Sequence, residues 1–249
     1  MAWILDLDGV VWLGDEGIPG AAEAVARLRA AGETVAFVTN NSYVPRQKVE
    51  AKLASFGIDA GSDVVTSAIA AATLVEPGET VLICAGPGAR QEVEARGARV
   101  VDRGAADAVV VGFDPGFDYE RMTAATRAVR GGARLIATND DATYPMADGL
   151  VPGGGAILAS IVTASGVAPV VAGKPYAPIV DLIRARYGPT GMAVGDRPDT
   201  DGRFAHALGY AFGLVLSGVT RADDLPVEPA PDVIAPDLTT LVVQQLAQH

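Results

Sequence analysis

Two aspartates near the start of the sequence, Asp6 and Asp8, have the residue type and spacing that chemistry at a charged site requires. They end an apolar run, residues 3–5, that predicts a short buried strand, and residues two apart on a strand share one face. Gly9 then allows the backbone to turn away without a steric penalty. Two adjacent carboxylates repel each other unless a cation or a proton compensates their charge. The pattern therefore indicates a metal-assisted carboxylate site, with an acidic turn after an edge strand as the alternative.

Polar residues at further predicted strand ends are of the kinds that phosphate chemistry uses. The hydroxyl and amide groups of residues 39–42 precede a predicted helix and suit a phosphate, although helix capping alone is an alternative. Lys174 lies between Gly173 and Pro175, where a lysine suits a point charge on a phosphate better than a surface position. The acidic residues of segment 195–201 could complete an oxygen-ligand site for magnesium, or they could be N-terminal acids of a helix.

Composition and charge exclude several classes of function. A formal net charge of -11 argues against binding to the phosphate backbone, so no nucleic-acid partner is expected. The single cysteine, Cys84, excludes an internal disulfide, and the only histidines, His206 and His249, exclude a zinc site built on several histidines. No apolar stretch has the length of a membrane span, and Asp6 comes too early for a signal peptide. These features predict a cytoplasmic protein without a membrane partner.

The elements that position these residues alternate between predicted strands and predicted helices along nearly the whole chain. Apolar runs such as 34–38, 80–84 and 192–194 predict buried strands. This alternation is typical of an α/β protein with a doubly wound parallel sheet. Turn-forming residues at 76–78 and 171–173 indicate boundaries, so a second α/β domain is expected between them. The length of 249 residues is sufficient for two domains.

The order and content of these segments resemble the haloacid dehalogenase (HAD) superfamily of phosphohydrolases, and within it the NagD-like, p-nitrophenyl-phosphatase-like branch. The similarity extends over nearly the full chain and includes segments 6–10, 39–42, 138–140, 149–153, 173–175, 195–201 and 216–219. Asp140 departs from the family pattern, because this branch often has a proline there. Each motif alone is weak evidence, whereas their order at the expected strand ends is specific.

The resemblance implies a phosphatase mechanism that uses Mg²⁺ as its cofactor. Asp6 would be the nucleophile that forms an aspartyl-phosphate, and Asp8 would protonate the leaving oxygen and later deprotonate water. Asp196 would hold the metal together with Asp6 and the backbone carbonyl of Asp8. Asp201 would bind the metal through water or orient its ligands. The residues expected to bind the transferring phosphoryl group are Thr39, Asn40 and Lys174.

The resemblance also predicts how the chain is divided. Residues 1–76 and 173–249 would form the catalytic core, and residues 77–172 would form an inserted α/β cap that selects the substrate. Tyr144 is a candidate substrate contact, with a packed aromatic side chain as the alternative. The expected partner is a small phosphorylated metabolite. Relatives of this kind often associate, so a homodimer is also an expectation.

Other functions remain open from the sequence. A phosphotransferase or a sugar phosphomutase could use the same paired aspartates. An inactive phosphate-binding module would keep the fold without turnover. A receiver-like signalling module fits poorly, because the chain is too long and its first predicted strand ends in Asp6 and Asp8.

Overall fold

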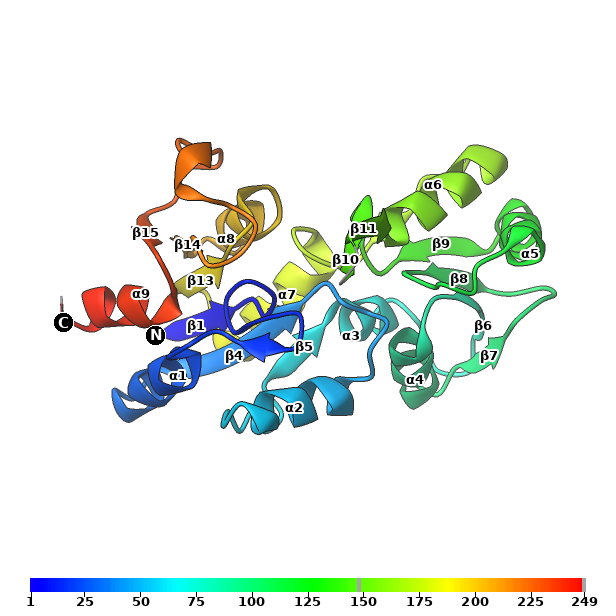
Figure 1. Ribbon diagram of the computed structural model, residues 1–249. Helices are drawn as coiled ribbons and strands as arrows, with labels where there is room; N and C mark the ends of the chain where they lie inside the picture. The colour runs from blue at the N-terminus through cyan, green and yellow to red at the C-terminus, as the bar shows by residue number, and fades with distance from the viewer. Residues whose placement is uncertain (147–148, 248–249) are drawn as a thin grey trace. The chain divides into compact units, whose positions relative to one another are not determined.

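The computed structural model describes residues 1–146 and 149–247 and divides the chain into two compact units (Figure 1). The first unit contains residues 1–39, 47–65 and 174–249, and the second contains residues 40–46 and 66–173. Each unit has its own parallel sheet. The expected α/β class, with a doubly wound core and a second α/β unit, is confirmed.

The units divide the chain at positions that differ from the boundaries expected from the sequence. Residues 66–76 group with the second unit, because α3 (Ser67–Ala72) packs against α4 (Pro87–Ala95) of that unit. Residues 40–46 also belong to the second unit, and the Gly88 N–H donates to the Tyr43 carbonyl at 2.9 Å. The assignment of a catalytic core and a cap to these parts of the chain stays a proposal.

The first unit is built on a sheet with strand order β15-β14-β13-β1-β4-β5. Strand β1 (Ala2–Leu5) is buried between β13 (Gly191–Gly195) and β4 (Thr34–Thr39), and it pairs in parallel with both. Leu5 is in register with Val194 of β13 and with Phe37 of β4. The remaining strands of this sheet are β5 (Val64–Thr66), β14 (Ala211–Val215) and β15 (Val233–Ala235).

Helices and a small hairpin complete the first unit. The helices are α1 (Ala21–Ala30), α2 (Arg46–Ser55), α7 (Ala177–Tyr187), α8 (Arg203–Leu208) and α9 (Leu238–Leu246). Helix α1 packs beside α9, and α7 packs beside α8. After β1 the chain turns at Gly9 and forms the hairpin of β2 (Trp12–Leu13) and β3 (Glu16–Gly17).

The second unit has a parallel sheet with strand order β12-β9-β8-β6-β7. Its strands are β6 (Thr80–Cys84), β7 (Arg99–Val101), β8 (Ala108–Val111), β9 (Arg134–Ala137) and β12 (Val170–Val171). Apolar residues of this sheet form a buried core with α5 (Tyr119–Arg130) and α6 (Gly154–Ser165). A separate antiparallel hairpin joins β10 (Thr143–Met146) to β11 (Gly149–Pro152).

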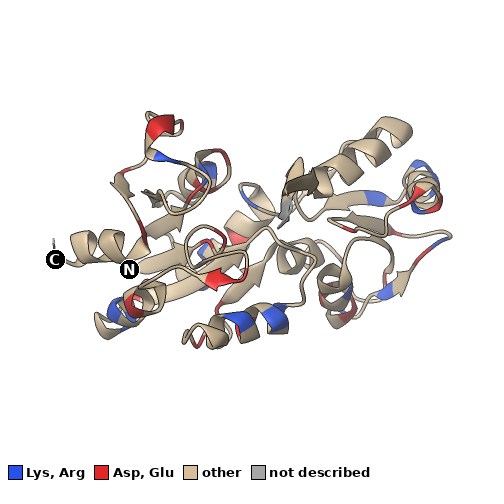
Figure 2. Cartoon of the chain, in the orientation of Figure 1, with Lys and Arg blue, Asp and Glu red and all other residues tan. Residues whose placement is uncertain are grey.

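Charged residues occur in both units (Figure 2). Helix α2 has a visible group of basic residues, and Lys52 lies in its last turn. Among the described residues, no helix is both long enough and apolar enough to cross a membrane.

The strands at the centre of the first sheet bring polar residues to one edge. Because β1, β4 and β13 are parallel neighbours, their carboxyl ends lie at the same edge. Asp6 follows β1, Thr39 ends β4, and Asp196 follows β13. The Asp6 N–H donates to the Val194 carbonyl at 2.8 Å, which extends the pairing of β1 and β13 as far as the aspartates.

Candidate active site

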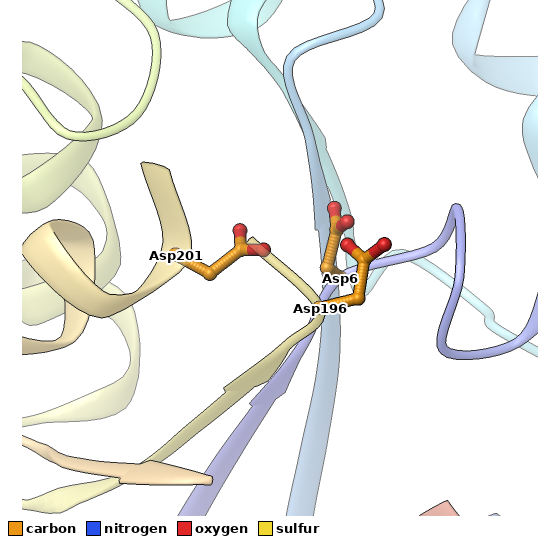
Figure 3. Close-up of side chains that lie close together, drawn as sticks. All are labelled: Asp6, Asp196 and Asp201. Carbon is orange, nitrogen blue, oxygen red and sulfur yellow. The ribbon is translucent and has the colours of Figure 1, made fainter. Parts of the chain in front are cut away.

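Three aspartates of the first unit converge at the carboxyl edge of its sheet (Figure 3). Asp6 and Asp196 follow neighbouring strands, and Asp201 lies in the short π-helical turn Pro198–Gly202. One carboxylate oxygen from each of the three lies within 4.8 Å of the others. Asp196 and Asp201 are only 2% and 3% exposed. The arrangement concentrates negative charge in a largely buried space.

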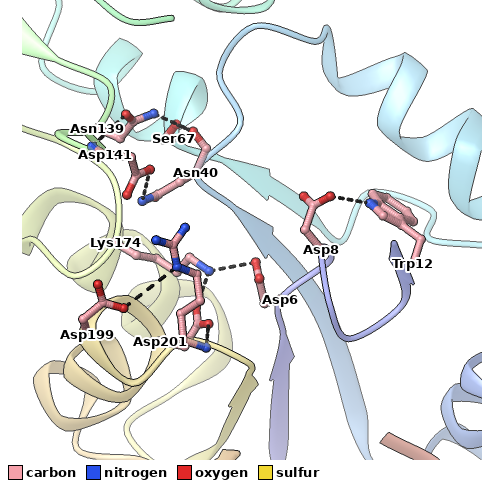
Figure 4. A network of polar contacts seen from close by, with 11 residues as sticks. Asp6, Asp8, Trp12, Asn40, Ser67, Asn139, Asp141, Lys174, Asp199 and Asp201 are labelled. Atoms are coloured by element: carbon pink, nitrogen blue, oxygen red, sulfur yellow. Dashed lines mark hydrogen bonds and ion pairs between the residues drawn. The ribbon is translucent and has the colours of Figure 1, made fainter. Parts of the chain in front are cut away.

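A buried lysine compensates part of this charge (Figure 4). Lys174 is 3% exposed, and its Nζ lies 2.8 Å from Asp6 Oδ1 and 2.6 Å from Asp201 Oδ1. The other oxygen of Asp201 accepts a hydrogen bond from the Arg197 N–H at 3.1 Å. Lys174 therefore belongs to the acidic cluster and not to the solvent-exposed surface.

Glycines leave the room that the Asp196 carboxylate needs. A Cβ atom at Gly9 or Gly218 would overlap this carboxylate, and Gly9 has a φ of 80°, which other residues rarely adopt. Asp196 Oδ2 accepts a hydrogen bond from the Val219 N–H at 2.6 Å. The Ser217 hydroxyl donates to the Gly9 carbonyl at 2.6 Å. The segment 217–219 thus packs against the turn after β1 and fixes the direction of the Asp196 side chain.

Burial and mutual repulsion disfavour the ionised aspartates. Burial raises the pKa of Asp6 well above its ordinary value, and the positive charge of Lys174 only partly opposes this shift. Burial, with the Asp201 charge adding to it, raises the pKa of Asp196 to about 6. Burial disfavours the charged form of Lys174, but Asp201 and Asp6 outweigh it and raise the lysine pKa above its ordinary range. The lysine therefore stays protonated, whereas the carboxylates need a further positive charge.

The donor set fits a hard divalent cation. Mg²⁺ prefers oxygen ligands, and the three convergent aspartates supply carboxylate oxygens. A single lysine cannot neutralise three carboxylates, and burial, with the charges of the neighbouring aspartates adding to it, raises the pKa values of Asp6 and Asp196. Within the described residues, no other group of His, Cys, Asp or Glu side chains converges in this way.

Asp8 has a separate hydrogen-bond partner. Its side chain is exposed, and its Oδ1 accepts a hydrogen bond from the indole Nε1 of Trp12 at 2.9 Å (Figure 4). Partial desolvation by neighbouring atoms raises the pKa of Asp8, while the Trp12 hydrogen bond opposes the shift. An accessible carboxyl whose pKa moves towards neutrality suits a group that both gives and takes protons.

The predicted phosphate-binding pair Thr39 and Asn40 is divided between the two units. Thr39 is 4% exposed and is assigned to the first unit, whereas Asn40 belongs to the second. The Asn40 side-chain amide donates to Asp141 Oδ2 at 3.2 Å (Figure 4). Its carbonyl accepts hydrogen bonds from Asn139 Nδ2 at 2.8 Å and from the Ser67 hydroxyl at 2.7 Å. These contacts hold Asn40 within the second unit.

Tyr144 is packed within the second unit. Its ring stacks on Phe113 with a centroid distance of 4.4 Å, and its hydroxyl accepts a hydrogen bond from Asn41 Nδ2 at 3.1 Å. Asn41 Oδ1 accepts hydrogen bonds from the backbone N–H groups of Tyr43 and Val44, so its side-chain oxygen caps the turn that follows it. The contacts of Tyr144 are those of a packed aromatic side chain, and contact with a substrate stays a prediction.

The sequence did not reveal several of the residues that position this site. The Trp12 indole and the Val219 N–H each contact a candidate site carboxylate. Asp141 contacts Asn40 across 101 residues of sequence. The available signals were weak: Trp12 follows Asp8 by four positions, and Asp141 adjoins the family segment 138–140.

The raised pKa of Asp196 predicts a pH-dependent effect of the substitution Asp196→Asn. A carboxyl whose folded-state pKa is raised contributes stability that is complete below its ordinary pKa and is lost as the pH rises through about 6. In the metal-free protein, Asp196→Asn should therefore raise the free energy of unfolding by about 1–3 kcal/mol near pH 7 and change it little near pH 4. Urea unfolding with a chelator present measures the difference, with Asp199→Asn in the same turn as the control. Equal or lower stability of Asp196→Asn at neutral pH would contradict the prediction.

Comparison with known proteins supports one family. A model described as haloacid dehalogenase-like hydrolase matches residues 3–99, and a second, described as HAD-hydrolase-like, matches residues 171–241. The acid sugar phosphatase of Staphylococcus saprophyticus is 36% identical, and the alignment covers 92% of each chain. The D-glycerol 3-phosphate phosphatase of Mycobacterium tuberculosis is 39% identical over 96% of this chain and 70% of its own length.

Solved structures agree with this relationship. The p-nitrophenyl phosphatase from Archaeoglobus fulgidus superposes with a TM-score of 0.93 at 32% identity, and the match covers 98% of both chains. The glycerol phosphate phosphatase from Mycobacterium tuberculosis, in complex with magnesium, has a TM-score of 0.88 at 38% identity, covering 96% of this chain and 75% of that one. The chain therefore belongs to the haloacid dehalogenase-like hydrolases, as a phosphatase of the NagD-like, p-nitrophenyl-phosphatase-like branch.

Proposed function

We propose that the protein hydrolyses small phosphomonoesters with the help of Mg²⁺ and through an aspartyl-phosphate on Asp6. The observation that carries this proposal is the position of Asp6, whose carboxylate converges with those of Asp196 and Asp201 and contacts the buried Lys174. A nucleophilic carboxylate needs no general base, but it needs positive charge nearby to accept an anionic phosphate.

The proposed Mg²⁺ ligands are the carboxylates of Asp6 and Asp196 and the backbone carbonyl of Asp8. Asp201 either binds through water or orients the other ligands. A cation in this position lowers the repulsion between the Asp6 carboxylate and the phosphate. The fit rests on the convergent oxygens and on the raised pKa values of Asp6 and Asp196.

The proposed chemistry has two steps, and Asp8 acts in both. In the first step an Asp6 carboxylate oxygen bonds to phosphorus, the ester P–O bond breaks, and the leaving oxygen takes a proton from Asp8. In the second step a water loses a proton to Asp8 and attacks phosphorus, the bond to Asp6 breaks, and inorganic phosphate leaves. Asp8 is thus returned to its starting protonation state.

Groups that hold the phosphoryl oxygens complete the proposal. Thr39 offers a hydroxyl at the end of β4, next to the strand that precedes Asp6. Asn40, which follows it directly, offers an amide donor. Lys174 is protonated and lies 2.8 Å from Asp6, so its charge acts where negative charge develops during transfer.

We propose phosphorylated sugars or polyols as the substrate class. The support is the pair of relatives named for sugar phosphate and glycerol phosphate hydrolysis, at 36% and 39% identity. A net charge of -11 supports a small metabolite rather than a nucleic acid. Action in the cytoplasm and assembly into a homodimer are part of the same proposal.

Hydrolysis of p-nitrophenyl phosphate is expected to require Mg²⁺. Without the cation, the Asp6, Asp196 and Asp201 carboxylates would repel the phosphate, so exhaustive chelation should abolish turnover. Phosphate release is measured before chelation, after it and after Mg²⁺ is restored. Ca²⁺ should support less turnover, because its looser coordination misplaces the nucleophile. Full activity in the chelated enzyme would contradict the proposal.

Asp6→Asn is expected to abolish both turnover and phosphorylation of the protein, because an amide cannot serve as the nucleophile. The measurement is rapid acid quenching with phosphate-labelled substrate, followed by detection of protein-bound label. Asp15→Asn is the matched control, since Asp15 is a fully exposed aspartate of the same unit. Label on the Asp6→Asn protein would show that another residue is the nucleophile.

We retain the proposal that residues 77–172 select the substrate and that Tyr144 contributes. Tyr144→Ala should then redistribute kcat/KM among natural substrates by about 1–3 kcal/mol, with a smaller effect on p-nitrophenyl phosphate. Tyr119→Ala is the control, because Tyr119 is a tyrosine of the same unit that is 79% exposed. A uniform fall across all substrates, with lower thermal stability, would assign Tyr144 to packing against Phe113 alone.

A further inference from the structure

The exposed carboxylate of Asp8 is tethered to a buried tryptophan. The indole Nε1 of Trp12 lies 2.9 Å from Asp8 Oδ1 (Figure 4). Asp8 is exposed, whereas Trp12 is 4% exposed. An exposed carboxylate without a partner can sample several rotamers, so a hydrogen bond from a buried ring restricts its orientation.

The backbone between the two residues is folded tightly. The N–H groups of Val11 and Trp12 lie 2.9 Å and 3.2 Å from the Leu7 carbonyl, and the Gly9 N–H donates to the Trp12 carbonyl at 2.7 Å. Asp8 and Trp12 are also partners in an isolated β-bridge. The local turn therefore sets the separation between the carboxylate and the indole.

The Trp12 ring is held on its other sides by residues at the end of α2. Lys52 Nζ lies 4.4 Å from the ring centroid and donates to the Gly14 carbonyl at 2.5 Å. Phe56 packs against Trp12 with a centroid distance of 6.1 Å. A Cβ atom at Gly17 would lie 2.8 Å from the Phe56 ring, so the hairpin and Phe56 are in close contact. The ring has little freedom to move with the Asp8 carboxylate.

The chemistry of the indole determines which carboxylate oxygen remains for the substrate. An indole N–H can only donate, so it can bond only to an oxygen that accepts. In a neutral carboxyl the carbonyl oxygen is the better acceptor, so this bond favours Oδ1 as the carbonyl oxygen and places the proton on Oδ2. Oδ2 is then the oxygen that gives a proton to the leaving group and takes one from water.

We infer that Trp12 is a positioning residue that holds the Asp8 carboxyl in one orientation, with Oδ2 available for proton transfer. The inference rests on the proposed phosphatase mechanism. A misoriented acid should matter most when the leaving oxygen cannot depart without a proton. It should matter least for p-nitrophenolate, which is a stable anion near neutral pH.

The test compares leaving groups in the Trp12→Phe enzyme with Mg²⁺ present. Phenylalanine keeps an aromatic ring against Phe56 and Lys52 but removes the N–H. The quantity measured is kcat/KM, which reports the first chemical step, for glycerol phosphate, phenyl phosphate and p-nitrophenyl phosphate. The expected result is a loss of about 10- to 100-fold for glycerol phosphate and less than about threefold for p-nitrophenyl phosphate. An equal loss for all three substrates, or no loss, would overturn the inference.

Lys48→Met is the matched control. It removes an exposed lysine of the same helix and leaves the contacts of the Trp12 ring and its indole N–H in place. Its kcat/KM values should keep the wild-type dependence on the leaving group. The same selective loss in Lys48→Met would overturn the role of the N–H.

A spectroscopic measurement keeps the inference testable even if Trp12→Phe folds poorly. The chain has 2 tryptophans, and the Nε1 of Trp3 has no hydrogen-bond partner among the described residues. In protein labelled with ¹⁵N-tryptophan, Asp8→Ala should shift the Trp12 indole resonance and speed its hydrogen exchange, and should leave Trp3 unchanged. An unchanged Trp12 resonance would overturn the inference. Failure of the wild-type enzyme to release phosphate would instead overturn the proposed function, so the two failures are distinguishable.

Discussion

The repulsion among buried carboxylates at the carboxyl edge of the first sheet is the constraint on which the candidate site depends. Asp6, Asp196 and Asp201 place oxygens within 4.8 Å of one another, and Lys174 places one opposite charge inside the cluster. Burial strengthens this conflict, because ionised groups lose water without gaining enough counter-charge. The result is a fold that carries unfavourable electrostatic energy at one place. A divalent cation can relieve that energy and would then allow an anionic phosphate to approach, which links the instability of the site to its proposed chemistry.

The backbone around this cluster restricts the position and orientation of each carboxylate. The pairing of β1 with β13 brings Asp6 beside Asp196, and the glycines at 9 and 218 leave space that any side chain would fill. The N–H groups of Val219 and Arg197 each hold one oxygen of an aspartate. The orientation of the Asp8 carboxylate is restricted differently, by a hydrogen bond from the indole of Trp12, which lies in the same turn. Uncharged N–H groups therefore fix the orientation of Asp196, Asp201 and Asp8 before a ligand binds, in addition to the contacts of Lys174.

Much of this arrangement could be predicted from the sequence, because strand ends leave a local signature. The apolar runs before Asp6 and Asp196 predict strands, and in the structure these strands pair in parallel, which brings their ends together. The contacts of Trp12 and Asp141 could not be predicted, since a hydrogen bond between side chains has no pattern in the chain. The structure divides the chain near residue 66, whereas the sequence analysis expects a boundary near residues 76–78. The turn residues at 76–78 are a strong local signal for a domain boundary. The packing of α3 against α4, however, groups residues 66–76 with the second unit.

The division of the chain into units separates two residues that the sequence analysis expects to bind the same phosphoryl group. The chain passes from the first unit to the second between Thr39 and Asn40, and it returns between Gly173 and Lys174. Lys174 is held by carboxylates of the first unit. Asn40, in contrast, is held by Asp141, Asn139 and Ser67, all of the second unit. A substitution at Asp141 would therefore disturb a candidate phosphate ligand without touching the carboxylate cluster. In the sequence Asn40 directly follows the first unit, but its hydrogen bonds are made within the second unit.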